Sequence, residues 1–265
     1  MKKKGPSISF IGAGNVATRF AVALSEKGCI IHQIISHHVE SAQILGEIVG
    51  ANFTSNNLDL LDDQSDFVII AVPDDHIKQV LKKIPFCLIG EQILLHTSGS
   101  YDESSLASYA RYFGSLYPLQ TLSKANNISL QTTPFLYNAN EEKAVKRVLH
   151  LSKLMSQNSH LYHHSERQKI HVAAVVVHNF TNHLWTLANQ YCHQQNLDFN
   201  ILWPLIQEGM KKAKKMGPFD AQTGPAIRGD VSTIHQHLDL LKDDQNFKQI
   251  YELISNSIQN IYLKS

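Results

Sequence analysis

The chain has 265 residues, 43% of them hydrophobic and 18% charged, and its 24 basic and 23 acidic side chains leave a formal net charge of +1. The length favours two domains and the composition is typical of a folded protein. The charge balance indicates no basic surface for nucleic acid or anionic lipid. We therefore expect small-molecule partners, no nucleic acid and no membrane association.

The cysteines and the apolar runs indicate a cytoplasmic protein. Cys29, Cys87 and Cys192 lie far apart and form no CxxC pair, which disfavours a disulfide framework and a zinc site. After the basic start of the chain, the apolar stretch at 8–11 is too short for a secretory signal. The nearly apolar run at 172–177 is far shorter than the roughly 20 residues of a membrane-spanning helix.

The first half of the chain alternates short β-branched runs with helical patterns, which predicts βαβ units. We expect strands at 8–11, 29–36, 67–72 and 93–96, weaker strands at 113–117 and 134–137, and helices at 16–27, 43–49 and 141–155. The fold class that follows is α/β, with a doubly wound Rossmann-type parallel sheet in a dinucleotide-binding domain over residues 1–164.

After residue 164 the alternation stops and only helical patterns follow. Ser165 can cap a long helix that runs to about residue 195, and further helices are expected at 200–215, 232–242 and 247–261. The run at 173–177 has strand propensity by residue type, but its helical flanks favour a buried helix. Residues 165–265 are therefore expected to form an all-helical domain.

A glycine fingerprint follows the first predicted strand and opens the first predicted helix. Gly12 permits a tight turn, Gly14 lets the backbone approach a pyrophosphate, and Ala17 keeps the helix close to the sheet. The helix N-terminus, at Asn15 and Val16, presents backbone N–H groups to the anion. A tight turn without any ligand is the alternative, but the surrounding βαβ pattern favours cofactor binding.

The end of the second predicted strand bears on the choice of cofactor. NAD-specific proteins place an Asp or Glu there, which hydrogen-bonds the ribose 2′-hydroxyl. This chain has Ser36, His37 and His38 instead, with no carboxylate to repel a 2′-phosphate. NADP is therefore favoured and NAD is less expected, although these residues can also be read as an ordinary loop.

Two further strand ends are expected to line the same cleft, because a doubly wound sheet binds ligands at the carboxyl ends of its strands. Val72, Pro73 and Thr97 are predicted to line the nicotinamide half, and Ser98 to contact the substrate. The alternative is that Pro73 only stops a strand and that Asp75 caps the next helix.

Four motifs carry a resemblance to a known family: GAGNVA at 12–17, HTSGS at 96–100, YPLQT at 117–121 and TGPAIRGD at 223–230. With them the chain resembles a family of bacterial NADP oxidoreductases in which a Rossmann-like domain precedes an uncharacterised helical domain. It is also similar to deazaflavin-dependent NADP oxidoreductases, pyrroline-5-carboxylate reductases and 6-phosphogluconate dehydrogenase-like enzymes. The resemblance implies that the helical domain is like the C-terminal domain of 6-phosphogluconate dehydrogenase and forms a homodimer.

The chain departs from these relatives at two places. His37 stands where the family often has Arg, and His171 and Asn179 stand nearest to the catalytic Lys and Asn of the hydroxyacid dehydrogenases. At 100° per residue, His171, His178 and Asn182 share one helical stripe, with Asn179 beside it. His171 could act as a general acid, Asn179 could orient the substrate and Asn182 could contact it; alternatively the stripe satisfies itself or a dimer interface.

Arg228 lies in a Gly- and Pro-containing segment between two predicted helices and could fork onto a substrate carboxylate or a cofactor phosphate. It could equally pair with Asp230 or cap a helix. His160, His163 and His164 form the closest histidine cluster, but no carboxylate or cysteine accompanies them at ligand spacing, so no metal is expected.

The predicted function is hydride transfer between NADPH and a small carbonyl, imine or hydroxyacid-type substrate. The alternative is a nucleotide-binding sensor or regulatory dimer without turnover, because no complete acid/base pair can be read from the sequence.

Overall fold

The computed structural model describes residues 5–124 and 128–263. The chain divides into two compact units, Met1–Val177 and His178–Ser265. The first holds the whole sheet and the second is all helical, which confirms the predicted fold class. The division lies beyond residue 164 because the first turns of helix α5 (His164–Ala174) are bonded to the sheet.

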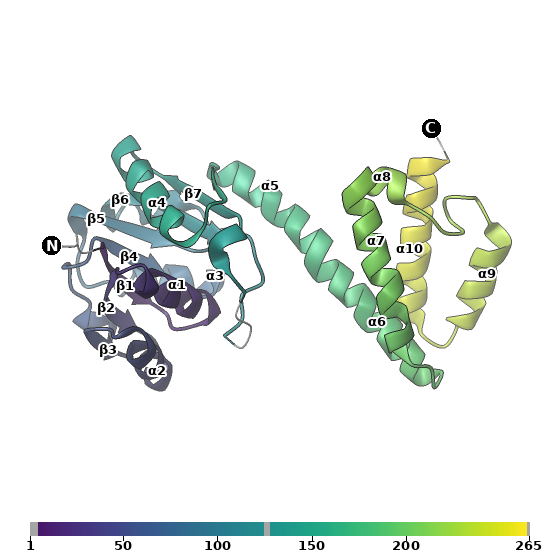
Figure 1. Cartoon of the computed structure of the whole chain (residues 1–265), viewed down its shortest axis with the longest axis horizontal. Helices are drawn as coiled ribbons and strands as arrows, with labels where there is room; N and C mark the ends of the chain where they lie inside the picture. Colours follow the sequence, from purple (N-terminus) through teal and green to yellow (C-terminus); the bar gives the residue numbers. More distant parts are fainter. Residues whose placement is uncertain (1–4, 125–127, 264–265) are drawn as a thin grey trace. The chain divides into compact units, whose positions relative to one another are not determined.

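An eight-stranded sheet forms the centre of the first unit (Figure 1). Its order is β3-β2-β1-β4-β5-β6-β7-β8, and its first six strands follow the dinucleotide-binding order. All neighbours are parallel except β6 and β7, which are antiparallel. The strands are β1 (Ser7–Ile11), β2 (Ile30–Ile35), β3 (Phe53–Ser55), β4 (Phe67–Ile70), β5 (Leu88–His96), β6 (Ala110–Pro118), β7 (Phe135–Ala139) and β8 (Ser159–Leu161).

Helices cover both faces of this sheet, because successive strand residues are apolar and point to opposite sides. On one face Phe10 and Ile69 pack with α1 (Asn15–Glu26), α2 (Val39–Val49) and α4 (Glu142–Met155). On the other face Ile11 and Ile70 pack with α3 (Asp74–Leu81). The carboxyl ends of β1, β2, β4 and β5 therefore meet at one edge of a sheet that is buried on both sides.

Two features of the first unit differ from the sequence prediction. Strands β3 and β8 were not expected, because three residues are too few to show a periodic pattern. Ser165 was expected to cap the long helix, but His163 occupies the cap position: its side chain accepts the N–H of Glu166, whose carboxylate accepts the N–H of His163. A reciprocal capping box fixes the start of α5 two residues earlier than predicted.

The predicted long helix continues from α5 through a π-helical segment, Val175–Phe180, into α6 (Thr181–Gln194). The run at 173–177 is helical as expected, but it is not buried: the side chains of Val176 and Val177 are 49% and 72% exposed. Among the described residues, His171 is the last of α5 whose side chain hydrogen-bonds to the sheet. The apolar run at 173–177 follows directly after it.

The second unit consists of α6 and the helices that follow it. These are a 3₁₀ turn (Phe199–Leu202), α7 (Trp203–Met216), α8 (Pro218–Ala221), α9 (Val231–Leu240) and α10 (Gln245–Tyr262). Its described part buries few apolar side chains, namely Leu187, Cys192, Ala226, Ile234 and Leu241. A search of the described residues finds no helix with the length and hydropathy needed to cross a membrane.

Candidate dinucleotide and proton-transfer site

The turn between β1 and α1 has the geometry that the glycine fingerprint predicts. Gly12 has a φ of +108°, and a Cβ there would run into the carbonyl of Ala71. Gly14 is exposed, and a Cβ built on it would meet nothing within 4 Å. One glycine is thus required by the fold, whereas the other leaves open space in front of the backbone.

Helix α1 starts directly behind that open space, with Gly14 in the N-cap position and no side-chain cap. The first N–H groups of a helix have no partner within the helix, so they remain able to hold an anion. Asn15 turns its side chain to the neighbouring loop, where its Oδ1 accepts the backbone N–H of Lys124 at 3.2 Å. Val16 is half-buried in the first turn. The turn therefore has the space and the backbone N–H groups that a diphosphate would need.

The end of β2 lies beside this turn, since the N–H of Gly12 bonds the carbonyl of Ile35 at 2.7 Å. Ser36 is half-buried, while His37 and His38 are exposed, with their rings edge to face at 5.0 Å. Helix α2 begins at Val39 without a side-chain cap, and Glu40 is the acidic residue of its first turn. Hydroxyl, imidazole and helix N–H donors are therefore grouped where a ribose 2′-substituent would lie.

The ends of β4 and β5 complete the edge. Val72 is half-buried and Pro73 is exposed, while Thr97 and Ser98 are buried. The N–H of Thr97 bonds the carbonyl of Ile70, so the two strand ends are held side by side. Pro73 occupies the N-cap position of α3, and Asp75 lies in its first turn rather than at the cap as the alternative reading expected.

His171 contacts the sheet next to these strand ends. Its Nδ1 lies 3.0 Å from the hydroxyl of Tyr117 on β6, and the two rings meet edge to face at 5.7 Å. A Cβ on Gly99 would approach Nδ1 of His171 to 2.7 Å and Cζ of Tyr117 to 2.9 Å. A side chain at position 99 would therefore displace His171 or Tyr117.

Tyr117 was not assigned a role from the sequence, although it opens the YPLQT motif. Burial, and secondarily the charge of Asp74, raise the pKa of its hydroxyl. The hydroxyl therefore keeps its proton, which it can donate to Nδ1 of His171 when the imidazole carries its own proton on Nε2. In the described part of the chain Nε2 of His171 makes no hydrogen bond.

A buried ion pair lies one turn earlier on α5, and sequence reasoning missed it. Arg167 is 0% exposed and donates to Ser115 Oγ at 2.7 Å, to the Tyr101 carbonyl at 2.6 Å and to Glu103 Oε2 at 2.6 Å. Burial alone would raise the pKa of Glu103, but the hydrogen bond and charge of Arg167 lower it. Arg167 and Glu103 are 64 residues apart, so no local pattern pairs them.

His96 at the end of β5 belongs to the same cluster. Its Nδ1 accepts the N–H of Ser98 at 3.2 Å, and its buried Nε2 has no hydrogen-bond partner. Burial, followed by the charge of Arg167, lowers the pKa of His96 to about 3. The imidazole is therefore neutral in the folded protein.

The residues that could ligate a metal in the described part of the chain are Asp102, Glu103 and His164. Only His164 belongs to the histidine cluster noted in the sequence; the carboxylates come from a turn some 60 residues earlier, which spacing could not reveal. The Arg167 guanidinium already bonds Glu103 and lies 3.2 Å from Nδ1 of His164. It supplies the positive charge that these groups need.

The other predicted residues belong to the second unit or to its boundary. Asn179 lies in the π-helical segment and Asn182 in α6, and both are exposed. The expectation of one stripe at 100° per residue is wrong here, because a π-helix bonds i to i+5 and turns less per residue. Arg228 is exposed, and neighbouring Asp230 caps α9 by accepting the N–H of Thr233.

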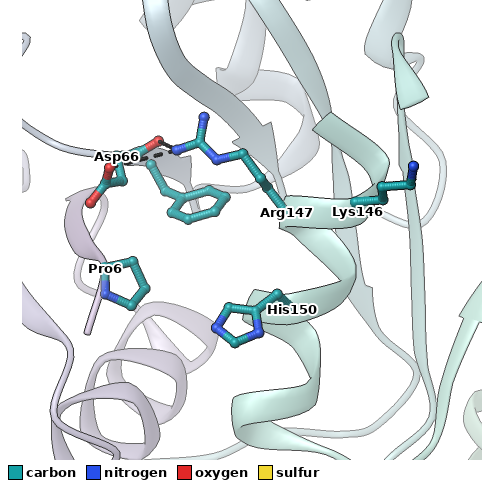
Figure 2. Close-up of a pocket in the computed structure, with 6 residues that line it drawn as sticks. Pro6, Asp66, Lys146, Arg147 and His150 are labelled. Atoms are coloured by element: carbon teal, nitrogen blue, oxygen red, sulfur yellow. Dashed lines mark hydrogen bonds and ion pairs between the residues drawn. The ribbon is translucent and has the colours of Figure 1, made fainter. Parts of the chain in front are cut away.

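A cavity of about 300 Å³ lies at the opposite end of the strands, lined by Pro6, Asp66, Phe67, Lys146, Arg147 and His150 (Figure 2). Its central cation is already paired: Arg147 bonds the carbonyls of Glu91 and Asp66 and lies over the ring of Phe67. We assign this cavity a structural role in fastening α4 to the sheet.

An open dinucleotide turn on a doubly wound sheet, followed by a helical unit, defines a class of nucleotide-dependent oxidoreductases, and comparison with known proteins agrees with it. Residues 7–97 match the family described as NADP oxidoreductase, coenzyme F420-dependent, and residues 133–258 match a domain of unknown function. A "putative NADP oxidoreductase" from Bacteroides fragilis is 33% identical, with a TM-score of 0.87 over 96% of this chain and 98% of that chain. The chain belongs to this family of NADP oxidoreductases with a Rossmann domain and a helical C-terminal domain.

More distant structures share the fold. The protein TM1727 from Thermotoga maritima is 22% identical, with a TM-score of 0.79 over 96% of this chain and 99% of that chain. A reductive aminase from Aspergillus terreus, in complex with NADPH and ethyl levulinate, is 12% identical, with a TM-score of 0.74 over 98% of this chain and 95% of that chain. A comparison with curated proteins finds no match.

Proposed function

We propose that the protein is a cytoplasmic, homodimeric enzyme that transfers a hydride between NADPH and a small carbonyl, imine or hydroxyacid-type substrate. One observation carries the proposal: there is open space in front of the backbone at Gly14, the N-cap residue of α1, and no side chain caps this helix. A turn that only had to connect a strand to a helix would not need this open space. The family membership and the NADPH complex of the reductive aminase support the same cofactor.

The preference for NADP over NAD rests on the end of β2. Ser36 and His37 offer donors to a 2′-phosphate, and α2 adds an uncapped N-terminus. The 2′-hydroxyl of NAD would find no strand-end carboxylate to accept its hydrogen bond. Val72, Pro73 and Thr97 are proposed to line the nicotinamide.

His171 is proposed as the proton donor. When bound, NADPH supplies the hydride, which adds to the substrate carbon. The broken C=O or C=N bond leaves its electron pair on oxygen or nitrogen, which takes a proton from Nε2 of His171 while Nδ1 takes the proton of the Tyr117 hydroxyl. No imidazolate forms, and the Tyr117 oxygen regains a proton from solvent. The Tyr117 hydroxyl, 3.0 Å from Nδ1, is proposed to donate to it and so to fix the tautomer. Ser98, Asn182 and Arg228 are proposed to contact the substrate, and Asn179 to orient it.

A thermal-shift comparison of NADPH, NADP+, NADH and NAD+ tests the cofactor. A ligand at about 100 times its Kd adds about 2.7 kcal/mol, so Tm should rise by several degrees with NADPH and less with NADH. Gly14→Ala should reduce this shift and lower the Tm of the free protein only slightly, because Ala is a weaker N-cap residue than Gly. Gly209→Ala is the matched control, because its Cβ also meets nothing within 4 Å. No shift with any dinucleotide would overturn the proposal.

Turnover separates an enzyme from a nucleotide sensor. NADPH oxidation is followed with a panel of small aldehydes, ketones and cyclic imines. His171→Ala should lower kcat by about 10²- to 10⁴-fold while the NADPH thermal shift is retained. Tight NADPH binding without turnover of any panel member would favour the sensor, and loss of folding in His171→Ala would make His171 structural.

A further inference from the structure

The ion pair between Arg167 and Glu103 requires two charged groups to be removed from water, which packing of α5 against the sheet does not by itself require. Arg167 is fully buried, its Nε has no hydrogen-bond partner, and the Glu103 side chain is 8% exposed. Removing charges from water costs several kcal/mol per ion, and a well-packed apolar pair of similar volume is often as stable or more stable. Stability therefore does not account for this pair, and its directional bonds remain to be explained.

Those bonds tie α5 to several parts of the sheet at once. Through Arg167 the helix reaches Ser115 on β6 and the segment after β5, at Tyr101 and Glu103. Glu103 also accepts from Asn138 Nδ2 on β7 at 2.8 Å. A planar guanidinium with several short bonds allows little rotation or sliding of the helix that carries it.

His171 follows Arg167 by four residues, so both side chains lie on one face of α5. One turn separates the anchored guanidinium from the imidazole that meets Tyr117 and Gly99. A small rotation of α5 would take Nδ1 of His171 beyond hydrogen-bond distance from the Tyr117 hydroxyl. We propose that Arg167, held by Glu103, is a positioning residue that fixes the tautomer and orientation of His171. The assignment of His171 as proton donor rests on the proposed function; its positioning by Arg167 does not.

The experiment follows the His171 ring by NMR of protein labelled with ¹⁵N-histidine, with signals assigned through His171→Gln. In the wild type, Nδ1 should appear as an acceptor and Nε2 as protonated. In Arg167→Met/Glu103→Leu, which removes both charges, the two shifts should move toward each other as the tautomers interconvert. Unfolding free energy should stay near the wild-type value in this double variant, because no charge is left unpaired.

Arg167→Lys is the milder variant, because it keeps the buried charge pair with Glu103 and loses only the planar guanidinium. It should show partly averaged His171 shifts. Glu103→Gln keeps the shape and one acceptor oxygen but leaves the Arg167 charge without its partner, so it should average the shifts and also lower the unfolding free energy. Arg147→Met is the control. The Arg147 guanidinium also donates to backbone carbonyls and lies over the ring of Phe67 (Figure 2), but it belongs to the cavity at the opposite ends of the strands. The His171 signals of this variant should match the wild type.

A stable double variant with wild-type His171 signals would overturn the inference, and so would averaged signals in Arg147→Met. The NADPH thermal shift is measured on the same samples and should be unchanged, because Gly14 belongs to another strand end. If the wild type neither binds nor oxidises NADPH, the proposed function fails while the NMR result still decides the role of Arg167.

Discussion

The two units of the chain cover their apolar side chains very differently. In the described residues the first unit buries forty hydrophobic side chains and the second buries five. The second unit, half as long, exposes large ones along several helices, such as Phe180 at 58%, Leu205 at 70% and Leu253 at 71%. Monomeric proteins rarely expose extended apolar surface. The first unit buries a large core of its own, and the second has the surface expected of a subunit interface, which supports the proposed homodimer.

The largest effect is expected from charges placed on the exposed apolar side chains of the second unit. Phe180→Asp/Leu205→Asp should convert the dimer into a monomer and make Tm independent of protein concentration, because charges would be buried in an apolar interface. Analytical ultracentrifugation measures the mass. Ile89→Asp is the control, since Ile89 is 79% exposed on β5 of the first unit and should not change association. A wild type that sediments as a monomer would contradict the dimer.

A second prediction compares glycines with similar backbone angles in the two units. Gly12 has a φ of +108° and Gly224 a φ of +112°, but only at Gly12 would a Cβ meet the backbone. Gly224→Ala should cost about 1–3 kcal/mol for its backbone conformation, and Gly12→Ala should cost about 1–3 kcal/mol more through crowding. Urea unfolding followed by circular dichroism measures both. Equal losses would show that Ala71 moves away easily.

A third prediction concerns pH. Because His96 has a pKa of about 3 when folded, it binds a proton only in the unfolded chain between pH 6.5 and 3. The free energy of unfolding should therefore fall as pH is lowered through this range, by up to about 1.4 kcal/mol per pH unit from this residue. His96→Gln should flatten the slope, whereas His235→Gln, at an exposed position of the second unit, should keep it. An unchanged slope in His96→Gln would refute the assignment.

The smallest effect is a difference in cysteine labelling. Burial raises the pKa of Cys29 to about 11, so iodoacetamide should modify it far more slowly than exposed Cys87. Cys192 is buried in the second unit, whose thinner core should open at a lower free energy, so its rate should lie between the two. Mass spectrometry of peptides over time measures all three rates. A Cys192 as slow as Cys29 would mean that both units open together.

The sequence predicted most of the first unit, because its information is local. Alternating apolar runs and the spacing of Gly12 and Gly14 give the strands, the helices and the turn. The strand ends at Ser36, Val72 and Thr97 follow once the sheet is known to be parallel. These residues do meet at one edge in the structure, while their roles toward a cofactor remain proposals.

The missed parts depend on contacts between distant segments. Arg167 meets Glu103 across 64 residues, and Tyr117 meets His171 across 54. The π-helical segment was missed as well, because a run of valines looks the same with either helical spacing. An Arg in a predicted amphipathic helix is normally expected to be exposed, so the burial of Arg167 could not be inferred from the sequence.

The open space at Gly14 has a consequence for how such a chain can evolve. Main-chain N–H groups are supplied by every residue type except proline, so a diphosphate held in this way places few demands on the side chains around it. In the proposed site, Gly14 is required for the absence of a side chain and not for a functional group. Under the proposed function, neighbouring positions can vary and adjust which dinucleotide is preferred, whereas a side chain added at Gly14 would occupy the space proposed for the diphosphate.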